Sequence, residues 1–256
     1  MNKSLLIARK DLAVMFASPL AFIVLGCFLV ITGYFFALHV VAYWDYGLQI
    51  MQMGGMTPGF GTSLFVIQPF IDASGLILLF FMPFVTMRGF SEEKRMGTME
   101  VLLSYPLTEI QLVSGKLLGL AGFLVAALAL HAVSPALLFL FANPEPLPAL
   151  TGYLGLFLLG LSFCSLGLFL SSLTERQIIS AVLAFASLLL LWLLLIPKMF
   201  LPPFWGELLA DLSILSHFET FTSGQIVFAD LIYYLTFILG FAWLTVLSLE
   251  NQRWRR

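Results

Sequence analysis

Long apolar stretches alternate with shorter polar segments along the chain. Six of these stretches are close to the length that crosses a bilayer as a helix, which is roughly 20 apolar residues. They cover residues 20–38, 68–87, 117–141, 152–173, 178–196 and 231–249. The second is the least regular, because Asp72 lies near its start and Pro83 lies inside it. The pattern predicts an all-α integral membrane protein with six transmembrane helices in a single domain, residues 1–256.

Residues 1–19 show a helical pattern that is not continuously apolar. Leu5, Ala8, Leu12, Met15 and Phe16 recur at helical spacing, with Lys3 and Lys10 on the far side. Such an amphipathic helix is suited to lie in the membrane interface. Ile7 and Val14 interrupt its polar face, which favours a helix that packs partly on protein. Ser18-Pro19 predicts where it ends.

The segment between the second and third stretches, residues 88–116, is short and highly charged. In the run Ser91-Glu92-Glu93-Lys94-Arg95, Ser91 is a candidate helix cap, and acidic residues precede basic ones, an order that complements the helix dipole. Gly97 predicts a left-handed stop, and Thr98 the start of a second short helix that ends before Pro106. Thr108-Glu-Ile-Gln111 has capping-box spacing and predicts the start of the third transmembrane segment. We expect a rigid helical elbow; the alternative is an ordinary solvated loop.

The segments on the opposite side differ from one another. Residues 197–230 are long for a connection and largely apolar, which predicts short helices that dip back into the membrane as re-entrant helices. Residues 39–67 are rich in Gly and Met and show no clear pattern. The Asn143–Pro148 stretch, with three prolines, predicts a turn that ends the third transmembrane segment.

Composition and charge define the class and the orientation of the protein. The chain is 61% hydrophobic and only 10% charged, which excludes a water-soluble fold, and its net charge of −2 provides no basic field for nucleic acid. Basic residues that flank membrane helices stay on the cytoplasmic side. If both ends, residues 88–116 and the turn at 174–177 share one side, that side holds 11 of the 12 basic residues. These are Lys3, Arg9, Lys10, Arg88, Lys94, Arg95, Lys116, Arg176, Arg253, Arg255 and Arg256. We therefore expect both termini, including the tail at residues 250–256, to be cytoplasmic.

Few residues have the spacing of catalytic or binding motifs. Ser114-Gly-Lys-Leu117 resembles the end of a P-loop, but no glycine stands five residues before Gly115 and the lysine is followed by Leu instead of Ser or Thr. We therefore expect no ATP hydrolysis by this chain alone. Asp72-Ala-Ser-Gly75 resembles the Gly-x-Ser-Gly of rhomboid intramembrane proteases, and His131 would be the base, although Asp replaces the first glycine. Cys27 and Cys164 are interpreted as small packing residues.

Three further polar residues are candidates for a pathway or its outer mouth: Asp72, His131 and His217. Ionisable groups within membrane segments often line pathways. The alternative for Asp72 is a solvated residue at a helix end. The alternative for each histidine is a polar residue that packs between helices and bonds to a neighbour. His131 and Pro135 together predict that the third transmembrane helix is locally irregular.

Several motifs occur in order along the whole chain and together indicate a family. They are Ala8-Arg-Lys-Asp-Leu12 with Phe16-Ala-Ser-Pro19, Phe90-Ser-Glu-Glu-Lys-Arg-x-Gly-Thr-x-Glu-Val-Leu-Leu103 with Gly115-Lys116, Ser171-Ser-Leu-Thr-Glu-Arg-Gln177, and Ser216-His-Phe-Glu-Thr-Phe-Thr-Ser-Gly224 with Asp230. In these motifs the chain resembles the permease subunits of ABC-2 type transporters, in particular those of the gliding-motility type and their relatives. The longer first outer segment departs from the simplest pattern of that family.

The resemblance implies a function for each part. Two permease subunits, identical or similar, would pair in the bacterial inner membrane, and each would dock a separate cytoplasmic ATPase subunit that binds ATP and Mg²⁺. No cofactor is expected in this chain itself. Residues Glu92, Glu93, Lys94, Arg95 and Glu100 would form the coupling helix that enters the ATPase, and Glu175 and Arg176 would make a second contact. The partners implied are the ATPase, the second permease and membrane lipids, with a periplasmic protein as a further candidate. A mechanical or scaffold subunit that acts on such a protein is the alternative to an exporter.

Overall fold

The computed structural model describes residues 3–52, 62–100, 105, 107–142 and 144–254, and all regular structure in these ranges is helical. The long helices are α2 (Pro19–Gln52), α3 (Gln68–Thr86, preceded by a π-helical turn at Ser63–Ile67), α6 (Glu109–His131), α8 (Pro146–Leu173), α9 (Gln177–Leu193) and α12 (Phe228–Trp254). The shorter ones are α1 (Lys3–Ala17), α4 (Ser91–Arg95), α7 (Val133–Phe141), η2 (Ile196–Met199), α10 (Pro203–Leu212) and α11 (Ile214–Thr222). Six helical stretches in the described ranges are long and apolar enough to cross a membrane. The chain is thus an all-helical membrane protein.

Helix α8 is the centre of the bundle. It packs against α3, α6, α9, α11 and α12. Of the residues in its most apolar 18-residue stretch, 72% are buried, whereas the corresponding share is 22% for the stretches of α2, α9 and α12. Gly155 and Gly160 allow this close packing, since a Cβ atom there would lie within 3 Å of Phe221 and Leu124 side-chain atoms. Many large apolar side chains of the other helices are exposed, among them Val30, Phe84 and Phe141.

Helix α1 packs along α6, as the interruptions in its polar face predict. Gly115, Gly119 and Gly122 of α6 lie beneath it at helical spacing, and the nearest α1 residues to them include Ile7 and Leu12. Leu5, on the apolar face of the predicted amphipathic helix, is 62% exposed in this chain. Ile7, which interrupts the polar face, lies against Gly115 of α6.

The largest differences between predicted and observed boundaries are at α2 and α8. Helix α2 runs on past residue 38 to Gln52, so residues 39–52 of the expected outer segment are helical, and residues 53–61 lie outside the described residues. Residues 39–52 hold aliphatic and aromatic residues that continue the helix, whereas most of the Gly and Met of the expected outer segment lies in residues 53–61. Helix α8 starts at Pro146, six residues before the predicted 152, because proline fits the first turn of a helix.

Other sequence predictions agree with the structure. A bend at Ser18 separates α1 from α2, and the predicted third segment is interrupted at Ala132, between His131 and Pro135. The Thr108 hydroxyl accepts from the Gln111 amide at 3.2 Å, and the Gln111 side chain accepts from the Thr108 amide, so the capping box is confirmed. The third helix therefore starts at Glu109, inside the segment predicted to be the elbow.

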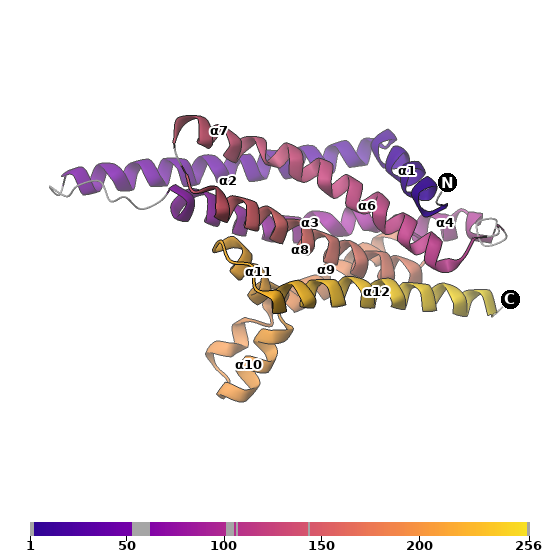
Figure 1. The fold of residues 1–256 in the computed structure, drawn as a ribbon. Coiled ribbons are helices and arrows are strands. Elements are labelled where there is room, and N and C mark those ends of the chain that lie inside the picture. The colour runs from indigo at the N-terminus through magenta and orange to yellow at the C-terminus, as the bar shows by residue number, and fades with distance from the viewer. Residues whose placement is uncertain (1–2, 53–61, 101–104, 106, 143, 255–256) are drawn as a thin grey trace.

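The bundle has two distinct ends. The start of α1, the end of α12 and α4 lie at one end, and α7, α10 and the far part of α2 lie away from it (Figure 1). Residues 197–230 contain the short helices α10 and α11 and most of η2, and their re-entry into the membrane stays a prediction. Helix α11 packs on α8, α9, α3 and α12, whereas α10 projects away from the bundle (Figure 1).

Candidate functional site

The charged elbow is held to the bundle by a serine of another helix. The backbone N–H groups of Phe90 and Ser91 donate to the Ser171 hydroxyl oxygen near the end of α8, at 2.8 and 3.1 Å. The Ser91 hydroxyl instead donates to the Met87 carbonyl at 2.8 Å. Ser91 is thus a buried first residue of α4, and the prediction that its side chain caps the helix is wrong. A distant hydroxyl satisfies the free amides at the helix start.

A buried lysine connects the elbow to two other helices. Lys116 of α6 is 6% exposed, and its Nζ lies 2.7 Å from Glu93 Oε1 and 3.3 Å from Asp11 Oδ2 of α1. The same ammonium lies 5.0 Å from the centroid of the Phe90 ring, within the range of a cation–π contact. A shift of α4 would therefore act directly on α1 and α6.

The end of α8 is joined to the elbow and to α12. Lys94 Nζ donates to the Ser172 carbonyl, which also accepts from Gln252 Nε2 at 3.0 Å. The Ser172 hydroxyl donates to Ser248 of α12 at 3.0 Å. Carbonyls in the last turn of a helix have no partner within it, and cationic side chains are favourable there.

The seven residues predicted to contact an ATPase divide into two groups. Glu93 and Lys94 point inward and make the contacts above. Arg95, Glu100, Glu175 and Arg176 are exposed, and Glu92 is partly exposed. Met96 follows Arg95 and is 59% exposed, and Gly97 adopts φ +69°, the left-handed stop that the sequence predicts. Of the second predicted helix, residues 98–100 are helical, and 101–104 and 106 lie outside the described residues.

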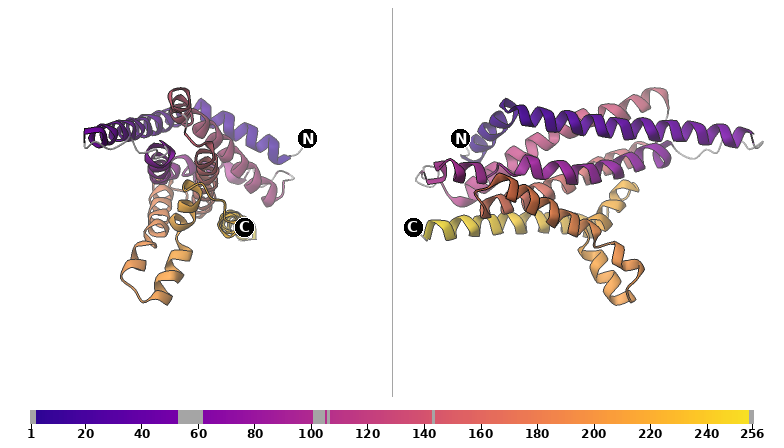
Figure 2. Two further views of the ribbon diagram at one scale, coloured as in Figure 1. Left: turned by 60° about the vertical axis from the view of Figure 1, so that its left-hand side comes forward. Right: turned by 180° about the vertical axis from the view of Figure 1, so that it is seen from behind.

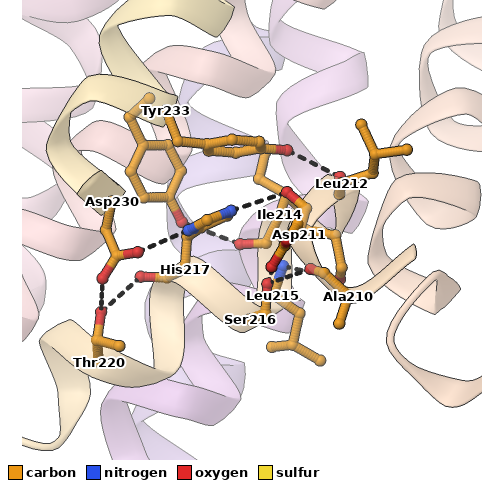
Figure 3. A network of polar contacts seen from close by, with 12 residues as sticks. Ala210, Asp211, Leu212, Ile214, Leu215, Ser216, His217, Thr220, Asp230 and Tyr233 are labelled. Atoms are coloured by element: carbon orange, nitrogen blue, oxygen red, sulfur yellow. Dashed lines mark hydrogen bonds and ion pairs between the residues drawn. The ribbon is translucent and has the colours of Figure 1, made fainter. Parts of the chain in front are cut away.

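A polar network connects α11 to α12 at the other end (Figure 3). His217 Nδ1 lies 2.6 Å from Asp230 Oδ1, and its Nε2 lies 3.0 Å from the Asp211 carbonyl oxygen. The Thr220 hydroxyl donates to the other Asp230 oxygen at 2.5 Å, and the Tyr233 ring stacks on His217 at 3.9 Å between centroids. Both imidazole nitrogens thus face acceptors, and His217 acts as a connector between helices.

His131 lies in the bundle interior in a chain of hydrogen bonds. Its Nε2 is 2.8 Å from the Ser74 hydroxyl and its Nδ1 is 2.8 Å from the Tyr153 hydroxyl. Its ring stacks on Phe70 with centroids 4.5 Å apart. His131 and Ser74 are 1% and 0% exposed, so the pair has no contact with water in this chain. The interpretation of His131 as a packed polar residue, bonded to a neighbour, fits this geometry.

Asp72 lies in the first turns of α3, with Thr222 and Glu219 of α11 beside it. It is partly buried, and its Oδ1 has no hydrogen-bond partner in the described residues. No hydrogen bond in the described part of the chain joins Asp72, His131 and His217 to one another, so the structure does not bring the three predicted pathway residues into one network.

Sequence reasoning missed several residues of these networks. Tyr153 carries no local signal, because it bonds to His131, 22 positions away, and Ser171 stands in a quoted motif that does not indicate its contact with Phe90. Asp11 and Lys116 occur in the motifs quoted above, but their pairing depends on how α1 packs on α6. In the described ranges no three His, Cys, Asp or Glu residues come together as a group that could hold a metal ion.

Comparison with known proteins does not identify a family. No protein-family model matches the chain, and no curated protein matches it. What the fold defines is the class: a multi-pass, all-helical membrane protein with six candidate membrane-spanning helices in its described part.

Proposed function

We propose that the chain is the membrane-spanning permease subunit of an ABC-2 type exporter in the bacterial inner membrane. It would work as a pair and would couple ATP hydrolysis by a separate cytoplasmic subunit to movement of a substrate. One observation carries the proposal: a short charged helix, α4, is exposed on one side and connected on the other to α1, α6 and α8. The motifs of the ABC-2 permeases support it.

The contacts of α4 suit it to transmit a movement. A force on Arg95 or Met96 would reach α6 and α1 through Glu93 and Lys116, and α8 through Ser171. Packed elements that move as rigid bodies carry such a shift better than a flexible loop does. ATP and Mg²⁺ would be bound by the ATPase subunit, and this chain would supply the mechanical contact.

The experiment targets only the outward side of the elbow. The protein is reconstituted in liposomes with a candidate ABC ATPase from the same organism, and Glu92→Ala/Arg95→Ala is compared with the unmodified chain. We expect the ATPase to co-purify poorly and to lose most of its stimulation by the membrane subunit. Glu207→Ala/Asp211→Ala, a matched pair of exposed charges on and at the end of α10, should have no effect. Unchanged stimulation in the α4 variant would refute the proposal.

A mechanical subunit that acts on a periplasmic protein is the second candidate. The outer part of α2 favours it, because helix that exceeds the bilayer offers a surface to a partner. Transport assays would separate the two, since a mechanical subunit would hydrolyse ATP with its partner and move no solute.

An intramembrane serine protease is a third candidate, favoured by the 2.8 Å contact of Ser74 with His131. The Ser74 hydroxyl also lies 2.6 Å from the Phe70 carbonyl oxygen, and the pair is buried. Labelling with a fluorophosphonate tests this candidate. We expect no labelling, because the Ser74–His131 pair is buried. Labelling that disappears in Ser74→Ala would establish a nucleophile.

A further inference from the structure

Helix α2 is longer than a bilayer requires. Its 34 residues extend about 51 Å at 1.5 Å per residue, whereas the hydrocarbon core is about 30 Å thick. Figures 1 and 2 show that its far part projects beyond the other helices. Trp44 is 68% exposed there and Met51 59% exposed. Apolar side chains within the bilayer contact lipid, but those beyond it need another cover.

The exposed side of α2 has the spacing of a coiled-coil seam. Eight exposed residues follow one another at alternating steps of three and four over more than three heptads. They are Cys27, Val30, Tyr34, Ala37, Val41, Trp44, Leu48 and Met51, which we call the seam. This 3.5-residue repeat is the spacing with which one helix packs along another. The occupant that fits the surface is therefore a helix that runs beside α2 over most of its length.

The same chain covers the other side of α2. Phe28 packs on Phe81 and Phe36 on Phe70, with ring centroids 6.1 and 5.1 Å apart. Farther out, the Tyr46 ring stacks on Phe65 at 5.3 Å. The rest of the bundle thus fixes which side of α2 faces outward, and the seam lies on that side.

Glycines border the seam at intervals of one or two heptads. A Cβ atom at Gly26, Gly33 or Gly47 would meet nothing within 4 Å. By contrast, a Cβ atom at any described glycine of α6 or α8 would contact a neighbouring helix. Small residues allow two membrane helices to approach closely. The three glycines of α2 have no such use within one chain.

We propose that the occupant is α2 of a second copy of this chain, and that the two helices form a parallel stalk that continues beyond the membrane. Two copies inserted in the same direction place their α2 helices parallel, and twofold symmetry then sets each seam residue against itself. The proposal rests on the proposed function, in which two permease subunits pair. It adds the surface through which the two copies meet outside the bilayer.

The flanks of the seam support pairing with itself. In a parallel pair, the residue just before the first seam position of each heptad (Tyr34, Val41 or Leu48) lies beside the residue five places later in the other helix. This places Gly33 opposite Leu38 and Gly47 opposite Gln52, a small residue against a larger one each time. Asp45, which is exposed, lies opposite Val40 and so meets no like charge. A seam for an unrelated helix would not need its own two flanks to be complementary.

Disulfide formation between copies tests the register. In a Cys27→Ala background, Trp44→Cys and Leu48→Cys are compared with Ala42→Cys and Gln49→Cys, which are also exposed but lie off the seam. Membranes are oxidised and analysed without reducing agent. We expect the two seam positions to give linked dimers at least fivefold more efficiently than the two off-seam positions, because only seam residues come within disulfide distance. Equal yields at all four positions, no dimer, or a link to a different protein would overturn the proposal.

A second comparison needs no crosslink and separates this proposal from the proposed function. Leu48→Asp should lower the dimer fraction measured by native mass spectrometry in detergent, whereas Gln49→Asp adds the same charge off the seam and should not. The ATPase is expected to co-purify with both variants, since α4 is unchanged. If Leu48→Asp still forms dimers and binds the ATPase, the α2 contact is refuted and the permease assignment is not. If the unmodified chain forms dimers but does not bind the ATPase, the permease assignment is refuted and the α2 contact is not.

Discussion

At the scale of single residues, Lys116 shows how a buried, paired charge can hold helices together in an apolar bundle. Its ammonium has two carboxylates and an aromatic face around it, all within 5.0 Å. A buried charge is tolerated only when it is paired, and removal of one partner leaves the other uncompensated. The three helices that supply these groups are therefore held in a defined arrangement.

Lys116→Met should destabilise the protein by about 3–5 kcal/mol, because Glu93 and Asp11 would lose the cation they share. Adding Glu93→Gln should restore part of the loss, because one uncompensated carboxylate is then removed. Unfolding in detergent, arranged as a double-mutant cycle, measures both effects. Lys198→Met removes an exposed lysine and is the control. Additive effects of the two substitutions would mean that the ion pair contributes nothing.

Asp230 connects α11 to α12 through two contacts, one with His217 and one with Thr220. Asp230→Ala should therefore release α11, at a cost of about 1–3 kcal/mol for the lost partners. Hydrogen exchange in α11 is expected to accelerate roughly tenfold or more, as followed by mass spectrometry. Asp45→Ala, at an exposed aspartate of α2, should leave α11 unchanged. Equal exchange in both variants would show that apolar packing alone holds α11.

At the scale of elements, helix packing decides what local pattern leaves open. The apolar lengths place all six membrane helices, and the capping box fixes the start of α6. Local pattern leaves open what the packed face of α1 contacts, because the glycine of α6 that receives Ile7 lies more than 100 residues away. The elbow illustrates the same limit: its charges were predicted, but which of them point inward depends on Lys116 and Ser172.

The packing of α1 on α6 depends on Gly115. A Cβ atom there would lie 2.7 Å from Ile7 Cβ and 2.9 Å from the Ser4 carbonyl oxygen. Gly115→Ala should push α1 away, at a cost of about 1–3 kcal/mol, and should speed trypsin cleavage after Arg9 and Lys10. Gly240→Ala in α12, where a Cβ atom would meet nothing within 4 Å, should leave the rate of this cleavage unchanged. Cleavage that stays slow in Gly115→Ala would show that α1 can shift without detaching.

At the scale of the whole molecule, the arrangement places the parts with different roles at opposite ends. The start of α1, α4 and the end of α12 share one end, and α10 lies away from it (Figure 1). Six crossings are consistent with both ends of the chain lying on one side, since an even number of crossings returns the chain to its starting side. The distribution of Lys and Arg then predicts which end is cytoplasmic.

Site-specific labelling tests this orientation. In a Cys27→Ala background, Glu175→Cys lies in the exposed turn between α8 and α9, and Glu207→Cys lies on exposed α10. A maleimide that cannot cross membranes should label Glu207→Cys in cells with a permeable outer envelope, and Glu175→Cys only after the inner membrane is opened. The buried thiol of Cys164 should not contribute to either signal. The opposite pattern would place α4 on the outside, where no ATPase could reach it, and would remove the basis of the coupling proposal.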